Sequence, residues 1–495
     1  MRMRTPFAAT GAALATLLLA SPAAAAPDGL DAGQPASQQV ATAAAAAPVQ
    51  VVQLGDSYSS GNGARDEAGN PAYSADAPSC LRSPFNYGQQ FATSIEAQYI
   101  NAACSGAVFA DIRTPKASAG VPAQIDAVTE QTDVVLMTMG GNDIGFGQIV
   151  VQCFALRSGD GCRSAIEQAQ AAIPQLEETA YTEISAIRAK MRPDAAFIYV
   201  GYPGLTSAEE LVLPTTDGQG YDMVAGLTEL QAAGEDAQAA AVARVNADSP
   251  CGARTFYLDT VDEAFAGHEI DQSQPGIDPA TWFWNFGETL TIGEIYHPKP
   301  AGWNAEAQLV SALYAEQVQT TPTLSVDPTS VLQGGEVTLT ADGFRSGETV
   351  RVVLAPDIDQ VVTVDQCGTF TGTITLSPET ATGERTVTAT SEATGASASA
   401  SFTVTAAPTT PPPTTEPTAP PTTTEPTAPT APPTTSESPS TTVAPIAGGS
   451  GGKSGSGGGQ LPRTGAGGVD ELGWVAIALL ASGGALLAAG RRRVS

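Results

Sequence analysis

The chain has 495 residues, of which 22 are basic and 51 acidic, so its formal net charge is −29. An electrostatic phosphate binder needs a basic face, and this surplus of carboxylates excludes nucleic acid as an expected partner. Only 15% of the residues are charged, while 51 are glycine and 37 proline, so we expect part of the length to be linker rather than one uniform globule.

Residues 1–26 have the layout of a secretory signal peptide. Arg2 and Arg4 precede an apolar run over 12–20, and small residues up to Ala26 offer a cleavage site. The run is too short to cross ~30 Å of hydrocarbon, which disfavours the alternative of an N-terminal anchor. We therefore expect a secreted chain with a flexible Ala-rich leader over 27–48, in an oxidising compartment where cysteines can pair.

Residues 49–319 alternate short apolar runs with longer helix-like stretches. The apolar runs, each followed by turn residues, are 49–54, 134–139, 196–200 and 255–258. Helices are expected over 163–190, 223–246 and 301–317, and a further one is expected to open at Ser83-Pro84. Strands that alternate with helices predict an α/β domain with a mostly parallel sheet covered on both faces. Functional sites in such sheets form at the carboxyl ends of the strands.

Residues 320–405 have a different composition, rich in Thr, Val and Ser. Polar and apolar residues alternate over 336–341 and 349–354, and Gly and Pro punctuate the segment. This pattern predicts a small all-β sandwich. Gly343-Phe344 followed by Gly347-Glu348 resembles the Ig-like modules of bacterial surface proteins.

Residues 406–460 are of low complexity. The heptapeptide that begins at Thr414 recurs at Thr423, and glycines dominate 448–459. Proline at this density favours extended polyproline II at ~3.1 Å per residue, so the segment is expected to be a disordered stalk that reaches on the order of 150 Å.

Residues 461–495 begin with Leu-Pro-Arg-Thr-Gly, continue with an apolar stretch over 472–490 and end near three arginines. At 1.5 Å per residue the stretch covers about 28 Å, enough to span a bilayer, and the arginines would stay in the cytoplasm. The arrangement resembles the LPxTG sorting signal of Gram-positive wall-anchored proteins. That resemblance implies that a sortase cleaves between Thr464 and Gly465, removes the membrane helix and joins Thr464 to peptidoglycan. The alternative is an ordinary single-span membrane protein.

Three sequence blocks carry residue types that suit ester chemistry. Gly55-Asp56-Ser57 directly follows the first apolar run, so the Ser57 hydroxyl is expected on a tight turn at the carboxyl edge of the sheet. Asn142 follows a glycine pair at the end of the next run, where its amide can point into the same pocket. The third block contains His297. The chain has only two histidines, so any Ser–His mechanism must use His297 or His268.

These blocks, in this order, resemble the SGNH (GDSL-like) hydrolase superfamily over about residues 49–318, in the form of the secreted esterases and lipases of high-GC Gram-positive bacteria. The resemblance implies a flavodoxin-like three-layer fold. It also implies that Ser57 is the nucleophile and that His297 is the general base that a serine hydroxyl needs. The implied oxyanion hole, which stabilises the tetrahedral intermediate, consists of the backbone N–H groups of Ser57 and Gly106 and the side-chain amide of Asn142.

The group that would orient His297 departs from the family pattern. The family has Asp three residues before the histidine, and this sequence has Glu294 there. Glu294 carries the same charge on one more methylene and is our expected orienting residue. The alternative is a backbone carbonyl, as in some relatives. We expect His268 to be structural or to line the cleft, and Asp56 and Asp143 to make local hydrogen bonds.

Six cysteines are expected to pair in a secreted chain. The resemblance implies the bridges Cys80–Cys104 and Cys153–Cys162. Cys251 and Cys367 are left, either as a bridge between the two domains or as two free thiols. The sequence has no Cys or His cluster with zinc spacing and no Gly-rich phosphate loop, so we expect neither a metal nor a cofactor.

The function that these features predict is that of a wall-anchored serine esterase or lipase, which cleaves acyl esters through an acyl-Ser57 intermediate. Its expected partners are an ester or lipid substrate, a sortase and peptidoglycan, and the chain is expected to be a monomer. One alternative is a carbohydrate O-acetyl esterase acting on wall or plant polysaccharide. Another is an adhesin whose hydrolase domain has decayed, although decay normally removes the serine or the histidine first.

Overall fold

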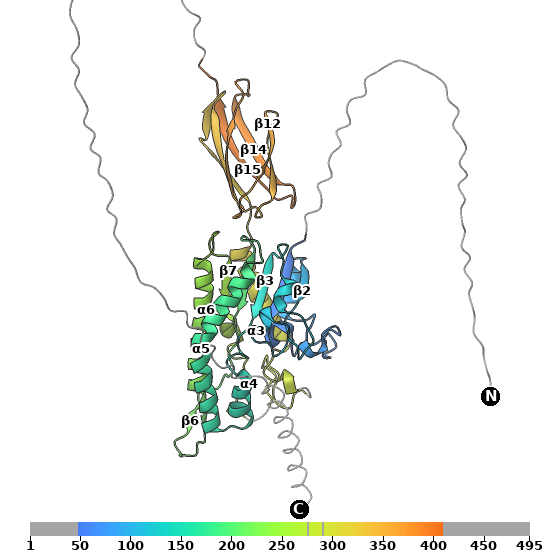
Figure 1. Ribbon diagram of the computed structural model, residues 1–495, viewed down its shortest axis with the longest axis vertical. Coiled ribbons are helices and arrows are strands. Elements are labelled where there is room, and N and C mark those ends of the chain that lie inside the picture. The colour runs from blue at the N-terminus through green and yellow to red at the C-terminus, as the bar shows by residue number, and fades with distance from the viewer. Residues whose placement is uncertain (1–47, 275–276, 290–291, 409–495) are drawn as a thin grey trace, which may run out of the picture. The chain divides into compact units, whose positions relative to one another are not determined.

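A computed structural model describes residues 48–274, 277–289 and 292–408 of the chain (Figure 1). Outside these ranges lie the predicted signal peptide, the leader up to residue 47, the Pro/Thr-rich stalk from residue 409 on, and the LPRTG signal with its apolar tail. Within them, no helix combines the length and the hydropathy needed to cross a bilayer.

Five parallel strands form the central sheet in the order β2-β1-β3-β4-β7. Their bounds are β1 Gln50–Gly55, β2 Gln98–Asn101, β3 Val134–Thr138, β4 Ala196–Val200 and β7 Thr255–Leu258. Four of them match the apolar runs in the sequence. The sequence pattern does not reveal β2, because this edge strand alternates between exposed and half-buried residues. The strand order reverses between β1 and β3, which is where doubly wound sheets place their sites.

Helices cover both faces of this sheet. One face carries α2 (Tyr87–Ser94), α7 (Val261–Phe265) and α8 (Pro300–Leu313), and the other carries α3 (Ala110–Arg113), α5 (Gly159–Arg188) and α6 (Met223–Ala247). Successive strand residues feed the two cores in turn: Leu136 faces the first layer and Met137 the second. The long helices α5 and α6 lie side by side (Figure 1). The predicted three-layer α/β arrangement is confirmed.

Short elements complete this domain. They are α1 Ser57–Ser60, η1 Pro78–Cys80, η2 Gln124–Ala127, α4 Phe146–Ile149, η3 Val150–Ala155, β5 Val212–Leu213, β6 Tyr221–Asp222, η4 Ile292–Glu294 and η5 Tyr314–Val318.

The predicted helix start at Ser83-Pro84 is wrong, because α2 begins three residues later. The Asn86 side chain caps it by accepting a hydrogen bond from the Gln89 N–H at 2.8 Å. The Ser83 N–H donates instead to the Ser60 carbonyl at 2.8 Å, which keeps Pro84 in the preceding turn.

Residues 323–405 form two sheets, in the orders β13-β10-β8 and β12-β11-β14-β15-β9. The strands are β8 Thr323–Asp327, β9 Ser330–Leu332, β10 Glu336–Asp342, β11 Thr349–Leu354, β12 Ile358–Thr363, β13 Phe370–Thr375, β14 Gly383–Ser391 and β15 Ser397–Thr405. All pairs are antiparallel except β15 with β9. Inward-facing residues of both sheets, such as Val337, Val352 and Phe402, share one apolar core.

Three disulfides occur in the described ranges. Cys80–Cys104 and Cys153–Cys162 are the two predicted bridges and are confirmed. The third, Cys251–Cys367, joins the α/β domain to the β domain, so the alternative of two free thiols is wrong.

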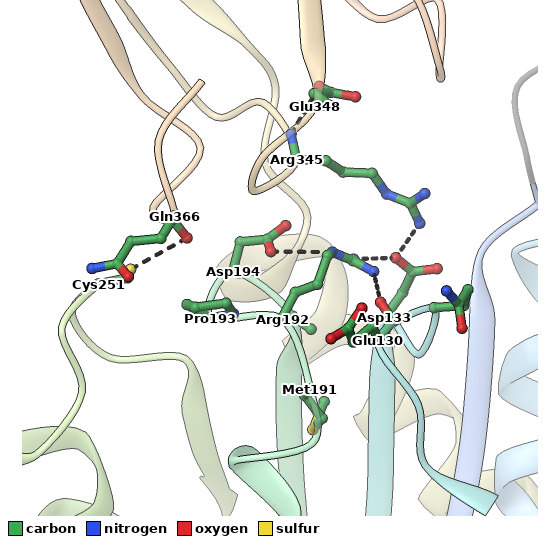
Figure 2. A network of polar contacts seen from close by, with 12 residues as sticks. Glu130, Asp133, Met191, Arg192, Pro193, Asp194, Cys251, Arg345, Glu348 and Gln366 are labelled. Carbon is green, nitrogen blue, oxygen red and sulfur yellow. Dashed lines mark hydrogen bonds and ion pairs between the residues drawn. The ribbon is translucent and has the colours of Figure 1, made fainter. Parts of the chain in front are cut away.

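An ion-pair network lies beside this third bridge (Figure 2). Asp133 accepts from Arg192 at 2.7 Å and also pairs with Arg345 of the β domain. Arg192 also contacts Asp194, at 3.3 Å. Asp133 precedes β3 and Arg192 precedes β4, so these groups stand at the amino edge of the sheet.

Candidate active site

Ser57 lies at the carboxyl end of β1, as the first residue of the one-turn helix α1. Asp56 caps this helix, since its carboxylate accepts from the Tyr58 N–H at 2.9 Å. The turn requires glycine at Gly55, where φ is +123° and an added Cβ would lie 2.3 Å from the Thr138 carbonyl oxygen. The close contact with β3 leaves no room for a side chain there.

Ser59 fixes α1 to the end of β3. Its Oγ accepts from the Thr138 N–H at 2.7 Å, and the Asp56 N–H donates to the Thr138 carbonyl at 3.0 Å. Because both groups are buried, water does not compete for these bonds. Asp56 and Ser59 therefore set the position of Ser57, rather than the side chain of Ser57 itself.

The structure brings His297 next to this turn. Its ring lies 5.1 Å from the Tyr58 ring, measured between centroids, and only 3% of the residue is exposed. The Tyr58 hydroxyl donates to the Tyr296 carbonyl, a bond between residues 238 positions apart in the chain. Tyr58, which follows the candidate nucleophile Ser57, therefore holds Tyr296, which precedes the candidate base His297.

Tyr296 adopts a left-handed backbone conformation with φ +63°, which costs a non-glycine residue on the order of 1 kcal/mol or more. Its ring stacks on Phe154 with centroids 4.5 Å apart, and its hydroxyl accepts from Gln272 at 2.8 Å. These contacts, together with Tyr58, hold the strained residue in place and so fix the direction in which His297 leaves the chain.

The predicted role of Glu294 as the group that orients His297 is wrong in this structure. The Nδ1 atom of His297 lies 3.2 Å from the carbonyl oxygen of Ile295. A carbonyl only accepts, so the proton lies on Nδ1 and the lone pair lies on Nε2. The alternative of a backbone carbonyl is the one that the geometry favours.

The carboxylate of Glu294 is occupied elsewhere. It accepts from both terminal nitrogens of Arg65, at 2.9 and 2.5 Å, from Tyr73 at 2.6 Å and from Thr289 at 2.5 Å. Burial alone would raise the pKa of Glu294, but these hydrogen bonds and the Arg65 charge outweigh it and lower the pKa. Glu294 therefore stays ionised as the partner of Arg65, which also lies 4.3 Å over the Trp284 ring.

The N–H groups predicted for the oxyanion hole are available. Among the described residues, the Ser57 and Gly106 amides donate to no protein acceptor, whereas the Ala107 N–H donates to Cys104 at 3.0 Å. The Asn142 amide donates one hydrogen to the Ala107 carbonyl at 2.9 Å, and this bond orients the second hydrogen. Asn142 thereby ties the end of β3 to the segment that follows Gly106.

An apolar pocket of about 110 Å³, open to solvent, includes Ser57 and Asn142 in its wall. Its other lining residues include Phe146, Ile149, Leu205, Leu227 and Leu230. Gln238, also in the wall, donates to the Met139 carbonyl at the sheet edge. Between Leu227 and Gln238, helix α6 rises about 16 Å at 1.5 Å per residue, so the pocket leads from the sheet edge outward along α6.

The remaining candidate residues have local roles. Asp56 accepts from the Tyr202 hydroxyl at 2.5 Å, Asp143 accepts from the Phe109 N–H at 3.1 Å, and burial raises the pKa of both carboxyls to about 7. His268 stacks on Trp282 with centroids 3.9 Å apart, which is a structural role. The described ranges contain no cluster of His, Cys, Asp or Glu that could hold a metal ion.

Sequence reasoning missed Asn62. Its amide nitrogen lies 3.5 Å from Nε2 of His297 and donates to the Gly293 carbonyl at 2.7 Å. Gly63 packs against the same loop, since an added Cβ would lie 3.2 Å from the His297 Cβ. A polar residue between two glycines, directly after the serine turn, is the signal that would have pointed to it.

The chain is similar to known lipases and acylhydrolases. The model of the GDSL-like Lipase/Acylhydrolase family matches residues 54–305. The chain is 30% identical over 267 residues to a lipase of Streptomyces rimosus, covering 53% of this chain and 87% of the relative. It is 30% identical over 270 residues to Lipase 1 of Streptomyces coelicolor, covering 53% and 86%. A crystal structure of phospholipase A1 from Streptomyces albidoflavus is similar at 25% identity and a TM-score of 0.43, over 54% of this chain and 99% of that one.

The pH dependence of hydrolysis tests the burial of His297. Desolvation lowers the pKa of this imidazole to about 4, so the ring stays neutral, and able to accept a proton, well below the ordinary value of ~6.5. We expect kcat/KM to fall on the acid side only as the pH approaches 4, with the acid limb in the same place in Asp56→Asn. Enzyme returned from pH 4 to pH 7 must regain its activity. An acid limb near 6.5 would contradict the burial of His297.

Removing the Glu294–Arg65 pair tests the corrected role of Glu294. Breaking a buried pair from one side leaves an unpaired charge and costs about 3–5 kcal/mol, so Glu294→Met should lower the free energy of unfolding strongly. We expect the double variant Arg65→Met/Glu294→Met to recover part of that stability and to keep measurable activity. A double variant that is fully stable but has lost ~10⁴ of kcat, as expected when the acid of a triad is removed, would restore Glu294 as the orienting residue.

Proposed function

The chain belongs to the GDSL-like lipase/acylhydrolase family, and from that premise we propose that it hydrolyses acyl esters with Ser57 as nucleophile and His297 as general base. The observation that carries the proposal is the contact of His297 with Tyr58, 5.1 Å between ring centroids, at the turn where Ser57 lies. The imidazole there is neutral, buried and protonated on the nitrogen that faces Ile295, which is the state that a general base needs.

In the proposed reaction, the Ser57 hydroxyl oxygen attacks the ester carbonyl carbon while its proton passes to Nε2 of His297. The Ile295 carbonyl, bound to Nδ1, stabilises the imidazolium that forms. The negative oxygen of the tetrahedral intermediate accepts from the N–H groups of Ser57 and Gly106 and from the Asn142 amide. The intermediate collapses, the alcohol leaves with the proton from His297, and an acyl-Ser57 ester remains. Water repeats the sequence and releases the carboxylic acid.

The shape of the pocket favours a lipid-like acyl ester over an acetylated sugar. Leu227, Leu230 and Phe146 offer an extended apolar wall beside Ser57, and burial of a methylene there contributes about 0.8 kcal/mol. An acetyl group would leave most of this wall unused. The adhesin alternative finds no support, because the chain retains both the serine and the histidine and folds their segments together.

We further propose that the enzyme is secreted and covalently attached to the cell wall of a Gram-positive bacterium. Support comes from the sequence alone: an N-terminal signal peptide, a Pro/Thr-rich stalk, and LPRTG followed by an apolar stretch and arginines. The β domain over 323–405, which resembles Ig-like modules in sequence, would then stand between the catalytic domain and the stalk.

Substrate selectivity tests the proposed function. The purified chain should hydrolyse p-nitrophenyl esters, with kcat/KM rising from acetate to octanoate as the acyl chain fills the pocket, and acetylated xylan should be a poor substrate. Ser57→Ala should abolish hydrolysis of all of them, whereas Ser60→Ala, a neighbouring serine of α1, should retain it. Full activity in Ser57→Ala would end the proposal, and a preference for acetyl esters would favour the carbohydrate esterase instead.

Cell fractionation tests the proposed wall attachment. In a Gram-positive host, muramidase should release the wild-type chain from the wall, whereas Thr464→Ala should remain with the membrane because no sortase can cleave it. Thr442→Ala, in the Thr-rich stalk that precedes the sorting signal, serves as the control and should behave as wild type. Wild-type chain that detergent extracts intact from membranes would contradict the proposal.

A further inference from the structure

The segment Gly106–Phe109 is held in place by side chains that reach it from outside. The Gly106 carbonyl accepts from the Lys116 ammonium at 2.8 Å, and the Ala107 carbonyl accepts from Asn142 at 2.9 Å. The next two amides are held by carboxylates: Val108 N–H donates to Asp111 at 3.0 Å, and Phe109 N–H donates to Asp143 at 3.1 Å. Each of these four residues therefore has one backbone polar group fixed by a side chain.

The conformation of Gly106 is not fixed by its own packing. Its φ is +71°, and an added Cβ would meet no atom within 4 Å. A glycine in open space can rotate about φ and ψ at little cost. The direction of its N–H, which the proposed mechanism aims at the oxyanion, must therefore be set by the peptide groups on either side.

The peptide groups on both sides are fixed by hydrogen bonds. On the N-terminal side, the Ser105 N–H donates to the Cys80 carbonyl at 3.0 Å, next to the Cys80–Cys104 disulfide. On the C-terminal side, the peptide group between Gly106 and Ala107 is held through its carbonyl by Lys116 and through its N–H by Cys104, at 2.8 and 3.0 Å. The peptide between them carries the Gly106 N–H.

Lys116 is built into this site rather than lying on the surface. Its side chain is 18% exposed and pairs at 3.2 Å with Asp111, which is 14% exposed. The same Asp111 oxygen accepts from the Val108 N–H, so the ion pair spans two backbone groups of the segment. A hydrogen bond from a charged donor is about twice as strong as a neutral one, and partial burial protects it from competing water.

We propose that Lys116 is a positioning residue for ester hydrolysis: its ammonium, braced by Asp111, holds the Gly106 carbonyl and thereby aims the Gly106 N–H at the oxyanion. Lys116 does not itself touch the substrate. This inference rests on the proposed function, since it assigns a cause to the geometry of that oxyanion hole. It predicts a defect in transition-state stabilisation with little change in substrate binding.

The test compares Lys116→Met, which keeps the length of the side chain but loses the donor, with Lys116→Arg, which keeps the donor. Removing an oxyanion donor outright costs about 10²–10³ in kcat, so loosening one should cost on the order of 10-fold. We expect Lys116→Met to lose this factor in kcat with KM nearly unchanged, and Lys116→Arg to recover most of it. Lys190→Met is the matched control, because Lys190 also donates to a backbone carbonyl, that of Ile125 at 2.7 Å, but in another loop.

A second measurement separates positioning from stability. A trifluoromethyl ketone with an acyl-like chain forms a tetrahedral adduct that occupies the oxyanion hole, whereas the corresponding fatty acid product binds only the pocket. Lys116→Met should weaken binding of the ketone by the same factor as kcat/KM and leave binding of the fatty acid unchanged. Equal weakening of both ligands, or a kcat within two-fold of wild type, would overturn the proposal. If the wild-type activity did not depend on Ser57, the proposed function itself would fail instead.

Discussion

The active site depends on one contact between distant parts of the chain: the Tyr58 hydroxyl donates to the Tyr296 carbonyl, and the Tyr58 ring lies beside His297. The serine turn belongs to β1 and is locked to β3, so it is part of the sheet. The histidine belongs to a loop that precedes α8 and has little regular structure of its own. Tyr58 joins the serine turn to the histidine loop. Because only 4% of Tyr58 is exposed, this contact is rigid. Without it, the strained backbone at Tyr296 would have less to hold it.

The loop that carries His297 is organised by two separate polar systems. The Ile295 carbonyl accepts from the His297 imidazole, and the Glu294 carboxylate accepts from Arg65 and Tyr73. The carboxylate near the histidine is therefore a structural anchor, while a backbone carbonyl orients the imidazole. The Glu294 carboxylate already accepts four hydrogen bonds, from Arg65, Tyr73 and Thr289, which occupy the about four lone-pair sites that a carboxylate offers.

Much of this site could be predicted from sequence, because apolar runs ending in Gly-Asp-Ser and Gly-Gly-Asn place side chains at one sheet edge wherever strands are parallel. The role of Ile295 could not be predicted from sequence, because every residue has a backbone carbonyl whatever its side chain. Glu294 misled for the opposite reason: its residue type fits a triad, but its partner Arg65 lies 229 positions away. Lys116 and Asn62 act through loop geometry, which hydrophobic periodicity does not encode. The edge strand β2 and the start of α2 were set by tertiary contacts and capping in the same way.

The two edges of the central sheet in the α/β domain have different roles. Cys251 and Asp133 precede β7 and β3 and engage the β domain through a disulfide and an ion pair. Ser57 and Asn142 follow strands at the opposite edge. The candidate active site and the contacts with the β domain therefore lie at opposite edges of the sheet.

Reaction with a fluorophosphonate ester, followed by peptide mass spectrometry, tests most directly whether His297 activates Ser57, because such reagents react fastest with a serine whose proton can be taken by a base. We expect one adduct, on Ser57, that forms at least 10²-fold more slowly in His297→Ala. An adduct on a different residue, or a Ser57 adduct that forms equally fast without the imidazole, would contradict it.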